Sequence, residues 1–360
     1  MCRAARQPPS GGLEALVHLW DVLYPDNLTD DLPEGFRAHC EAVCALGVAH
    51  GLGPLLNHRL SATWPGSDVP DELLEALRVV VRREVVGQEL IRRYVEPDVQ
   101  ALEREVPVVW LKGPALGHTA YEAPHLRVYR DIDLLVRRDE VERAARTLVS
   151  IGYRCRWTSV PHLSMHGPVF EREVAERSLT AYVELHTHVA PCTLYRVPPP
   201  DRLWTAATPA RVWGRERLVL APEHAYLQSA IQVIRAVSAG TLCLRRIVDC
   251  KELRRSGLLD GARLRAEAAE CGCRGLVGFL RDCERPDSLV LPEALSPATR
   301  RLLPVLNDLL AGTRRTRARL RAWFAILHTF DRRRDRWRHV FCRAGAKMGH
   351  LVRKRAQATW

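Results

Sequence analysis

The sequence predicts an α+β protein, in which a mixed sheet with flanking helices lies between an N-terminal helical module and a C-terminal helical region. Two observations predict this class. Apolar residues recur at three- and four-residue steps near both ends of the chain, as in amphipathic helices, whereas short apolar or alternating runs typical of strands are confined to the middle. The expected boundaries are residues 1–105 for the helical module, 106–220 for the α/β core, 221–313 for the C-terminal helices and 314–360 for a basic tail.

Helices are expected throughout residues 13–105. The clearest begins at Pro70-Asp71, because proline is suited to a helix start and Leu73, Leu77 and Val81 then follow at four-residue steps. Such a stripe buries one face of a helix against a neighbour. The sequence therefore predicts a helical module before the first strand.

The pattern changes at Pro107. Residues 108–111 form a short continuous apolar run that predicts a buried strand, and Gly113-Pro114 ends it and begins a short helix. Within residues 128–136, Ile132, Leu134 and Val136 alternate with Asp131, Asp133 and Leu135, and this period of two predicts a second strand. A helix is expected from Arg138 to Gly152, followed by strands near residues 153–157, 181–189 and 218–220. Beyond Pro222 the predicted helices are residues 223–237, 242–255, 259–271, 276–283 and 297–310.

The positive charge is concentrated at one end. The 360 residues include 54 Lys and Arg against 42 Asp and Glu, a net charge of +12, but residues 314–360 alone hold 15 bases and two acids. The remainder is close to neutral, and the 47% hydrophobic content of the whole chain excludes a disordered or collagen-like protein. Arg alternates with large apolar residues in the tail, which predicts amphipathic helices that dock on the body or on an anionic partner, either RNA or a membrane surface.

Cysteine usage and hydropathy favour a cytoplasmic protein. The eleven Cys are scattered and form no CxxC pair, so neither a disulfide scaffold nor a zinc ribbon is expected. The N-terminus lacks the apolar segment of a signal peptide, and no apolar run approaches the roughly 20 residues that span a bilayer.

Two acids in the second predicted strand are the first candidate site residues. Asp131 and Asp133 are two positions apart, so their side chains project from one face of the strand and repel each other. Because Ile132, Leu134 and Val136 make this strand too apolar for a free edge, the acids need a partner. Paired carboxylates suit Mg²⁺, which also accepts phosphate oxygens.

The turn before them is the second candidate. Lys112 and Gly113 follow a buried strand and precede a helix, a place where backbone N–H groups can bind an anion. The chain contains only four lysines, so a lysine at this turn favours a phosphate contact over a simple strand-to-helix turn.

These residues resemble a known family. Leu111-Lys-Gly-Pro-Ala-Leu116, Tyr121, Arg127, Asp131-Ile-Asp-Leu-Leu-Val136 and Gly152-Tyr153 are similar to the pattern of a nucleotidyltransferase family within the polymerase-beta-like superfamily. The similarity is dense over residues 108–153. It continues more loosely through Val183-Glu-Leu-His186, Leu220-Ala-Pro-Glu-His224 and Leu244-Arg-Arg-Ile-Val-Asp249.

The resemblance implies a polymerase-beta-like nucleotidyltransferase core that uses two Mg²⁺ and an NTP, with ATP the favoured substrate. Asp131 and Asp133 would bind the metal ions, and Glu184 is the expected third carboxylate, either as a ligand or as a base. Lys112, Gly113 and Arg127 would bind the triphosphate. Pro114 follows the glycine where the superfamily usually has serine, so one hydroxyl contact to phosphate is missing.

The leading functional hypothesis is Mg²⁺-dependent transfer of AMP from ATP to a hydroxyl of a small molecule or natural-product intermediate. Transfer to RNA or to a protein side chain is the first alternative, and the basic tail would serve it. A non-catalytic nucleotide-binding or interaction protein of the same fold is the second. No GxGxxG, HExxH or GxSxG motif supports a Rossmann, zinc-protease or serine-hydrolase site.

Overall fold

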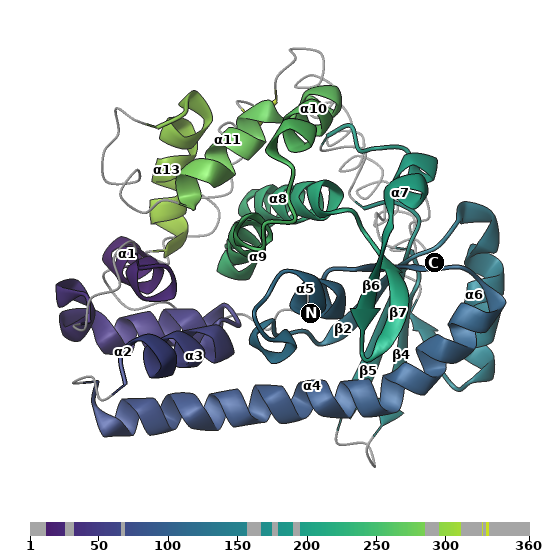
Figure 1. The fold of residues 1–360 in the computed structure, drawn as a ribbon, viewed down its shortest axis with the longest axis horizontal. Helices are drawn as coiled ribbons and strands as arrows, with labels where there is room; N and C mark the ends of the chain where they lie inside the picture. The colour runs from purple at the N-terminus through teal and green to yellow at the C-terminus, as the bar shows by residue number, and fades with distance from the viewer. Residues whose placement is uncertain are drawn as a thin grey trace, which may run out of the picture.

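The computed structural model describes residues 12–25, 32–65, 69–156, 167–174, 179–189, 195–284, 295–310, 326 and 329–330. Helices lie at both ends of these residues and a sheet lies between them, so the predicted α+β class is confirmed (Figure 1). Almost all of the predicted tail, residues 314–360, lies outside the described residues.

Four helices precede the sheet, as the sequence predicts. They are α1 Gly12–Leu23, α2 Glu34–Ala49, α3 Gly53–Thr63 and α4 Asp71–Glu105. Helix α4 begins directly after Pro70 and runs beneath both the N-terminal helices and the sheet (Figure 1). Its first half contributes Leu77 to the core of the helical module, and its second half packs against the sheet through Val95, Val99 and Leu102.

The sheet has seven described strands in the order β3-β4-β5-β2-β1-β7-β6. It is mixed, because β2 runs parallel to β5 and β1 parallel to β7, while the other neighbours are antiparallel. The strands are β1 Val109–Leu111, β2 Asp131–Leu135, β3 Arg154–Arg156, β4 Val169–Val174, β5 Leu179–His186, β6 Thr208–Val212 and β7 Arg215–Val219. The sequence predicts five of these, and β4 and β6 are found only in the structure.

Short helices join the strands. They are α5 Gly113–Thr119, the 3-10 helices η1 Pro124–Leu126 and η2 Arg138–Glu140, α6 Val141–Ser150 and α7 Pro200–Ala206. The C-terminal helices follow at the predicted places: α8 Pro222–Ser238, α9 Leu244–Arg255, α10 Gly261–Cys271, α11 Arg274–Cys283 and α13 Pro297–Leu310. No helix among the described residues is long and apolar enough to cross a membrane.

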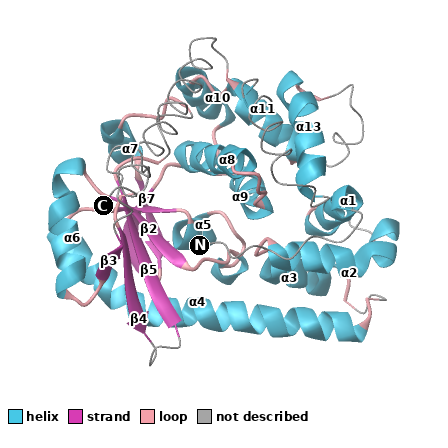
Figure 2. Cartoon of the chain, turned by 180° about the vertical axis from the view of Figure 1, so that it is seen from behind, coloured by secondary structure: helices cyan, strands magenta, loops and turns pink. Residues whose placement is uncertain are grey.

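The sheet separates two hydrophobic cores. Helices lie on both sides of the sheet (Figure 2). On one face, alternate residues of β2 and β5 such as Ile132 and Val183 pack with α4 and α6. On the other face, Leu111 and Leu135 join the larger core, which includes α5 and α8. Residues of the strands thus alternate between the two cores, as the period of a buried strand requires.

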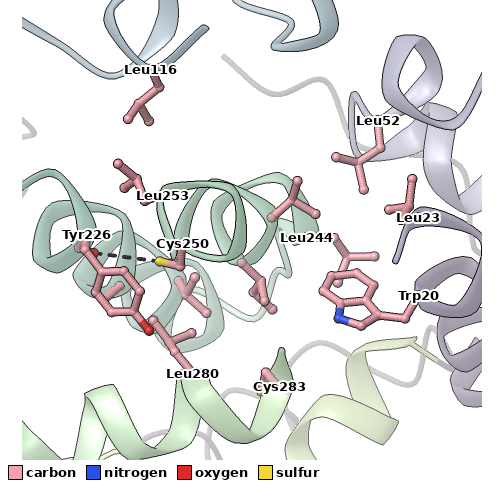
Figure 3. Packing of buried hydrophobic residues seen from close by; sticks show 14 of the residues in the cluster. Trp20, Leu23, Leu52, Leu116, Tyr226, Leu244, Cys250, Leu253, Leu280 and Cys283 are labelled. Carbon is pink, nitrogen blue, oxygen red and sulfur yellow. Dashed lines mark hydrogen bonds between the residues drawn. The ribbon is translucent and has the colours of Figure 1, made fainter. Parts of the chain in front are cut away.

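The larger core joins the two ends of the chain. Trp20 and Leu52 of the N-terminal helices belong to the same cluster as Leu244, Leu280 and Cys283 of the C-terminal helices (Figure 3). Residues 12–64 and 222–306 therefore share buried surface, although they are far apart in the sequence. The division into four regions stays a prediction.

Arg217 of β7 is a buried cation that links the sheet to α4. Its guanidinium lies 4.5 Å from the ring centre of Trp110 and 5.6 Å from that of Trp213, and its Nε lies 3.2 Å from a carboxylate oxygen of Glu103. The side chain is only 2% exposed. Arginine can stack and donate hydrogen bonds at once, which suits it to this position.

Candidate active site

The pairing of β2 with β5 brings the predicted acids together. In the parallel register Asp133 lies beside Glu184 and Asp131 beside Tyr182. Ile132 and Leu134 point into the core shared with α4 and α6, so Asp131 and Asp133 point to the opposite face, toward α5 and α8. The strand alternation predicted from the sequence therefore places three carboxylates on one face of the sheet.

Asp133 is at the centre of the site and is 2% exposed. One of its oxygens, Oδ1, lies 2.6 Å from the Lys112 ammonium and 2.7 Å from Nε2 of His186. Burial alone would raise the pKa of Asp133, but the Lys112 charge and the hydrogen bond with His186 hold that pKa well below its usual range. Asp133 is thus a buried, ionised carboxylate with two compensating partners.

The pKa of Glu184 is shifted in the opposite direction to that of Asp133. Its side chain is 21% exposed, and its Oε2 lies 3.6 Å from Nε2 of His186. Burial and the nearby carboxylates of Asp133 and Asp131 raise the pKa of Glu184 to about 7. Glu184 can therefore exchange a proton near neutral pH, while Asp133 stays ionised.

His186 also belongs to the site, although the sequence predicted no role for it. It is buried, and burial lowers the pKa of its imidazole despite the neighbouring acids. The sequence spacing indicates this position, because Glu184 and His186 are two positions apart on one strand and so share a face. The next alternate residue, His188, is half-buried, and its Nδ1 lies 3.0 Å from the Thr187 hydroxyl.

The turn between β1 and α5 holds Lys112 in position. Lys112 adopts a positive φ of 47°, which is uncommon for a residue with a side chain, and its ammonium points to Asp133. A Cβ atom on Gly113 would lie 3.2 Å from the Cβ of Tyr129 and 3.5 Å from the carbonyl oxygen of Asp131. A side chain at Gly113 would therefore crowd the segment that leads into β2.

The donor set fits a divalent cation. Asp133, Glu184 and His186 each offer one ligand atom, and these atoms lie within 4.8 Å of one another. In the part of the chain that the structure describes, this is the one such group of His, Cys and acidic residues. Carboxylate oxygens suit Mg²⁺ and Mn²⁺, and an imidazole nitrogen suits softer transition metals such as Zn²⁺. Asp131 lies on the same face, two residues before Asp133.

Arg127 is not brought to this group. It is 2% exposed, and its guanidinium donates hydrogen bonds to both carboxylate oxygens of Asp249 in α9, with a distance of 2.8 Å from Nη2 to Oδ2. A further bond goes to the carbonyl oxygen of Val128. The geometry gives Arg127 a structural role between β2 and α9, and it lends no support to the triphosphate contact expected from the sequence.

A comparison with protein families identifies the chain's relatives. The family described as "Uncharacterised nucleotidyltransferase" matches residues 37–284, which include every predicted site residue and more than half of the chain. No curated protein and no solved structure matches the chain significantly. The family match agrees with the resemblance expected from the sequence, and the chain therefore belongs to this nucleotidyltransferase family.

Proposed function

We propose that the protein is a Mg²⁺-dependent enzyme that transfers AMP from ATP to a hydroxyl group of a small molecule. The observation that carries this proposal is the pairing of Asp133 with Glu184 across β2 and β5, with Asp131 on the same face and the Lys112-Gly113 turn beside them. Membership of a nucleotidyltransferase family supports the reaction class.

The proposed roles follow from the positions of the side chains. Asp131, Asp133 and Glu184 would hold the two metal ions, with His186 orienting Asp133 through their 2.7 Å hydrogen bond. Bound Mg²⁺ supplies neutralisation of the negative charge that develops on the phosphates and leaving pyrophosphate. Lys112 would contact a phosphate, because its ammonium lies 2.6 Å from the Asp133 carboxylate proposed to hold the metal ions.

Glu184 is suited to remove the proton of the acceptor hydroxyl. Its carboxylate, ionised when a metal ion is bound beside it, can accept that proton, and it lies on the same face of the sheet as Asp133. Asp133, with its lowered pKa, is the better permanent ligand. Glu184 would therefore act as the base as well as a ligand, and Asp133 as a ligand alone.

Transfer from α-labelled ATP, CTP, GTP and UTP in the presence of Mg²⁺, followed with small polyols, RNA and protein as acceptors, tests the proposal. Asp131→Asn and Asp133→Asn should each lower transfer at least about a thousandfold, since metal-based charge stabilisation contributes several kcal/mol. Asp139→Asn, an exposed acid in η2, is the matched control and should retain wild-type activity.

The outcomes separate the hypotheses. Label appearing on a small polyol supports the proposed acceptor class, whereas label retained on RNA or protein supports the polymer alternative. Transfer that survives Asp133→Asn would refute the assigned metal site. An absence of both transfer and pyrophosphate release with every nucleotide would favour a non-catalytic binding protein.

A further inference from the structure

Only two described residues other than glycine have a positive φ, and one of them has no part in the proposed function. Lys112 has φ 47° and ψ −138°, and Trp213, between β6 and β7, has φ 51°. Residues with large side chains rarely adopt such backbone conformations, which persist only where surrounding contacts hold them. The contacts of Trp213 lead from its own turn to that of Lys112.

Trp213 lies at the tip of the β6–β7 hairpin. Val212 pairs with Arg215, so Trp213 and Gly214 form a two-residue turn in which both φ angles are positive. Asn-Gly is a favoured sequence for such a turn, because asparagine tolerates a positive φ better than a bulky residue does. Trp213 is nevertheless 7% exposed. The unfavourable backbone conformation therefore places an indole in the protein core.

Trp213 contacts the segments on both sides of the β1–α5 turn. Its backbone N–H donates to Nε2 of His118 in α5 at 3.4 Å, and α5 packs beside β6 (Figure 1). The ring centre of Trp110 in β1 lies 4.9 Å from that of Trp213, with the two rings nearly perpendicular. The ring centre of Tyr129, two residues before β2, lies 6.3 Å away. The indole thus lies among β1, α5 and the residues that lead into β2.

Tyr129 extends these contacts to the β1–α5 turn itself. A Cβ added to Gly113 would lie 3.2 Å from Cβ and 3.6 Å from Cγ of Tyr129, so the backbone of Gly113 lies directly against the tyrosine. Tyr129 is 7% exposed, and its hydroxyl lies 3.5 Å from the carbonyl oxygen of Gln88 in α4. Tyr129 cannot move away from Gly113 without losing its contacts with α4 and Trp213. The aromatic pair therefore fixes the backbone next to Lys112.

We propose that Trp213 is a positioning residue for Lys112. Its indole holds Tyr129 against Gly113 and so keeps the β1–α5 turn in its unfavourable conformation. In that conformation the Lys112 ammonium lies 2.6 Å from a carboxylate oxygen of Asp133. Without the indole, the turn relaxes to an ordinary φ and the ammonium leaves the carboxylate. This assignment rests on the proposed function, in which Lys112 contacts a phosphate.

Carbon NMR of the full-length, metal-free protein labelled with [ε-¹³C]lysine tests this coupling without a measurement of activity. The chain contains four lysines, so four signals are expected, and Lys112→Met identifies the signal of Lys112. Trp213→Leu should move that signal toward the position of a solvent-exposed lysine and leave the signal of Lys251 unchanged. Trp213→Phe, which retains an aromatic ring, should keep the wild-type Lys112 signal.

Trp20→Leu is the matched control. Trp20 is 2% exposed and its ring centre lies 6.0 Å from that of Tyr24, but it belongs to α1 and to the other hydrophobic core. Its loss should lower stability and leave the Lys112 signal in place, which separates the loss of a buried indole from the loss of positioning.

Circular dichroism of each variant checks that the fold is retained. If Trp213→Leu does not fold, Trp213→Asn decides the question, because Asn-Gly suits the hairpin turn and still lacks the indole. A Lys112 signal at its wild-type position in the folded variant would overturn the proposal.

Transfer kinetics supply a second measurement. Lys112→Met should lower kcat/KM for the nucleotide by about 10- to 100-fold, because a hydrogen bond to a charged group contributes about 1.5–3 kcal/mol and each 1.4 kcal/mol is a factor of ten. Trp213→Leu should lower it by no more than this, and should cause no further loss when Lys112 is already replaced. Losses that multiply in the double variant would show that Trp213 acts independently of Lys112 and would overturn the positioning role.

The two proposals fail in different ways. A Lys112 signal that does not respond to Trp213, in a protein that transfers nucleotides, overturns the positioning role alone. A Lys112 signal that responds to Trp213, in a protein that transfers no nucleotide, overturns the proposed reaction and leaves the control of Lys112 by Trp213 standing.

Discussion

Arg127→Met should lower the free energy of unfolding by about 3 kcal/mol, because the buried Asp249 loses its two hydrogen bonds from Arg127 and keeps only its contacts with Arg246 and the Tyr121 hydroxyl. Arg127 and Asp249 are 2% and 0% exposed, and the substitution removes two hydrogen bonds to Asp249 and one to the Val128 carbonyl. Methionine retains much of the apolar volume of the arginine stem, so the loss reports mainly on charge and hydrogen bonding. A phosphate-binding arginine would behave differently, because its removal lowers nucleotide affinity and leaves stability nearly unchanged.

Urea unfolding of the full chain, followed by circular dichroism at pH 7, measures this effect. Asp249→Asn should also destabilise the protein, and the double variant should lose at least about 1.5 kcal/mol less than the two single losses together, since the second substitution breaks a pair that is already broken. Arg143→Met is the matched control. Arg143 pairs with Glu105 at 3.4 Å with both side chains 51% exposed, so its loss should stay within about 1 kcal/mol.

The pH dependence supplies an independent check. Burial alone would raise the pKa of Asp249, but Arg127 and Arg246 hold that pKa below its usual value. A carboxyl with a lowered folded-state pKa adds stability that is present above its unfolded pKa of about 4 and is lost as the pH falls through the folded value. The stability difference between wild type and Asp249→Asn should therefore shrink below about pH 4. A destabilisation under about 1 kcal/mol for Arg127→Met, with nucleotide affinity reduced, would refute the structural role.

Three further predictions concern other parts of the molecule. Glu184→Gln should raise the melting temperature of the metal-free protein at pH 8 but not at pH 5, as scanning fluorimetry can measure. The reason is that the raised pKa of Glu184 makes its ionisation cost stability as the pH rises from about 4.5 to about 7. Equal shifts of the melting temperature at both pH values would contradict this. Arg217→Met should lower the free energy of unfolding by about 2–4 kcal/mol, through loss of the contacts with Trp110 and Trp213 and of the ion pair with the partly exposed Glu103. A loss under about 1 kcal/mol in urea unfolding would contradict a role for Arg217 in holding the sheet to α4. Gly117→Ala should destabilise the protein by about 1–3 kcal/mol, since the added Cβ would lie 2.9 Å from the Pro124 carbonyl oxygen. Gly87→Ala in α4 should instead stabilise the protein by about 0.5–1 kcal/mol, because its Cβ would have no neighbour within 4 Å. A change of the same sign for both variants would refute the steric argument.

Local pattern was sufficient to predict most elements. Strand β2 was predictable because its apolar residues alternate with acids, and α4 because its start and its stripe are both clear. Strand β4 has Glu171, Arg172 and Glu173 in its centre, so its sequence gives little hydrophobic signal. Strand β6 lies at the edge of the sheet and contains Pro209, which is tolerated there and favours a loop in sequence-based prediction.

Spacing within one segment was enough to predict part of the site, and the family resemblance added Glu184. Asp131 and Asp133 share a face because of strand geometry, and the same argument links Glu184 to His186. By contrast, Arg127 binds Asp249, which is 122 positions away in the sequence, and no helix or strand periodicity predicts such a contact. An arginine four residues before an acidic motif can either contact a bound phosphate or form a structural ion pair. Only the tertiary structure decides between these two roles.

The site's charges suggest why one acid should govern metal binding. Asp133 is already compensated by Lys112 and by His186, so the repulsion among the three carboxylates falls mainly on Glu184, whose pKa is raised to about 7. A divalent cation binds here only when Glu184 is ionised. Below pH 7 part of the binding free energy of the cation is therefore used to release the proton of Glu184. Metal affinity should therefore rise with pH up to about 7 and then level off. A site whose acids were all ionised, as an exposed acidic surface would be, shows no such rise, so the pH profile of metal binding distinguishes a built centre from a chance group of acids.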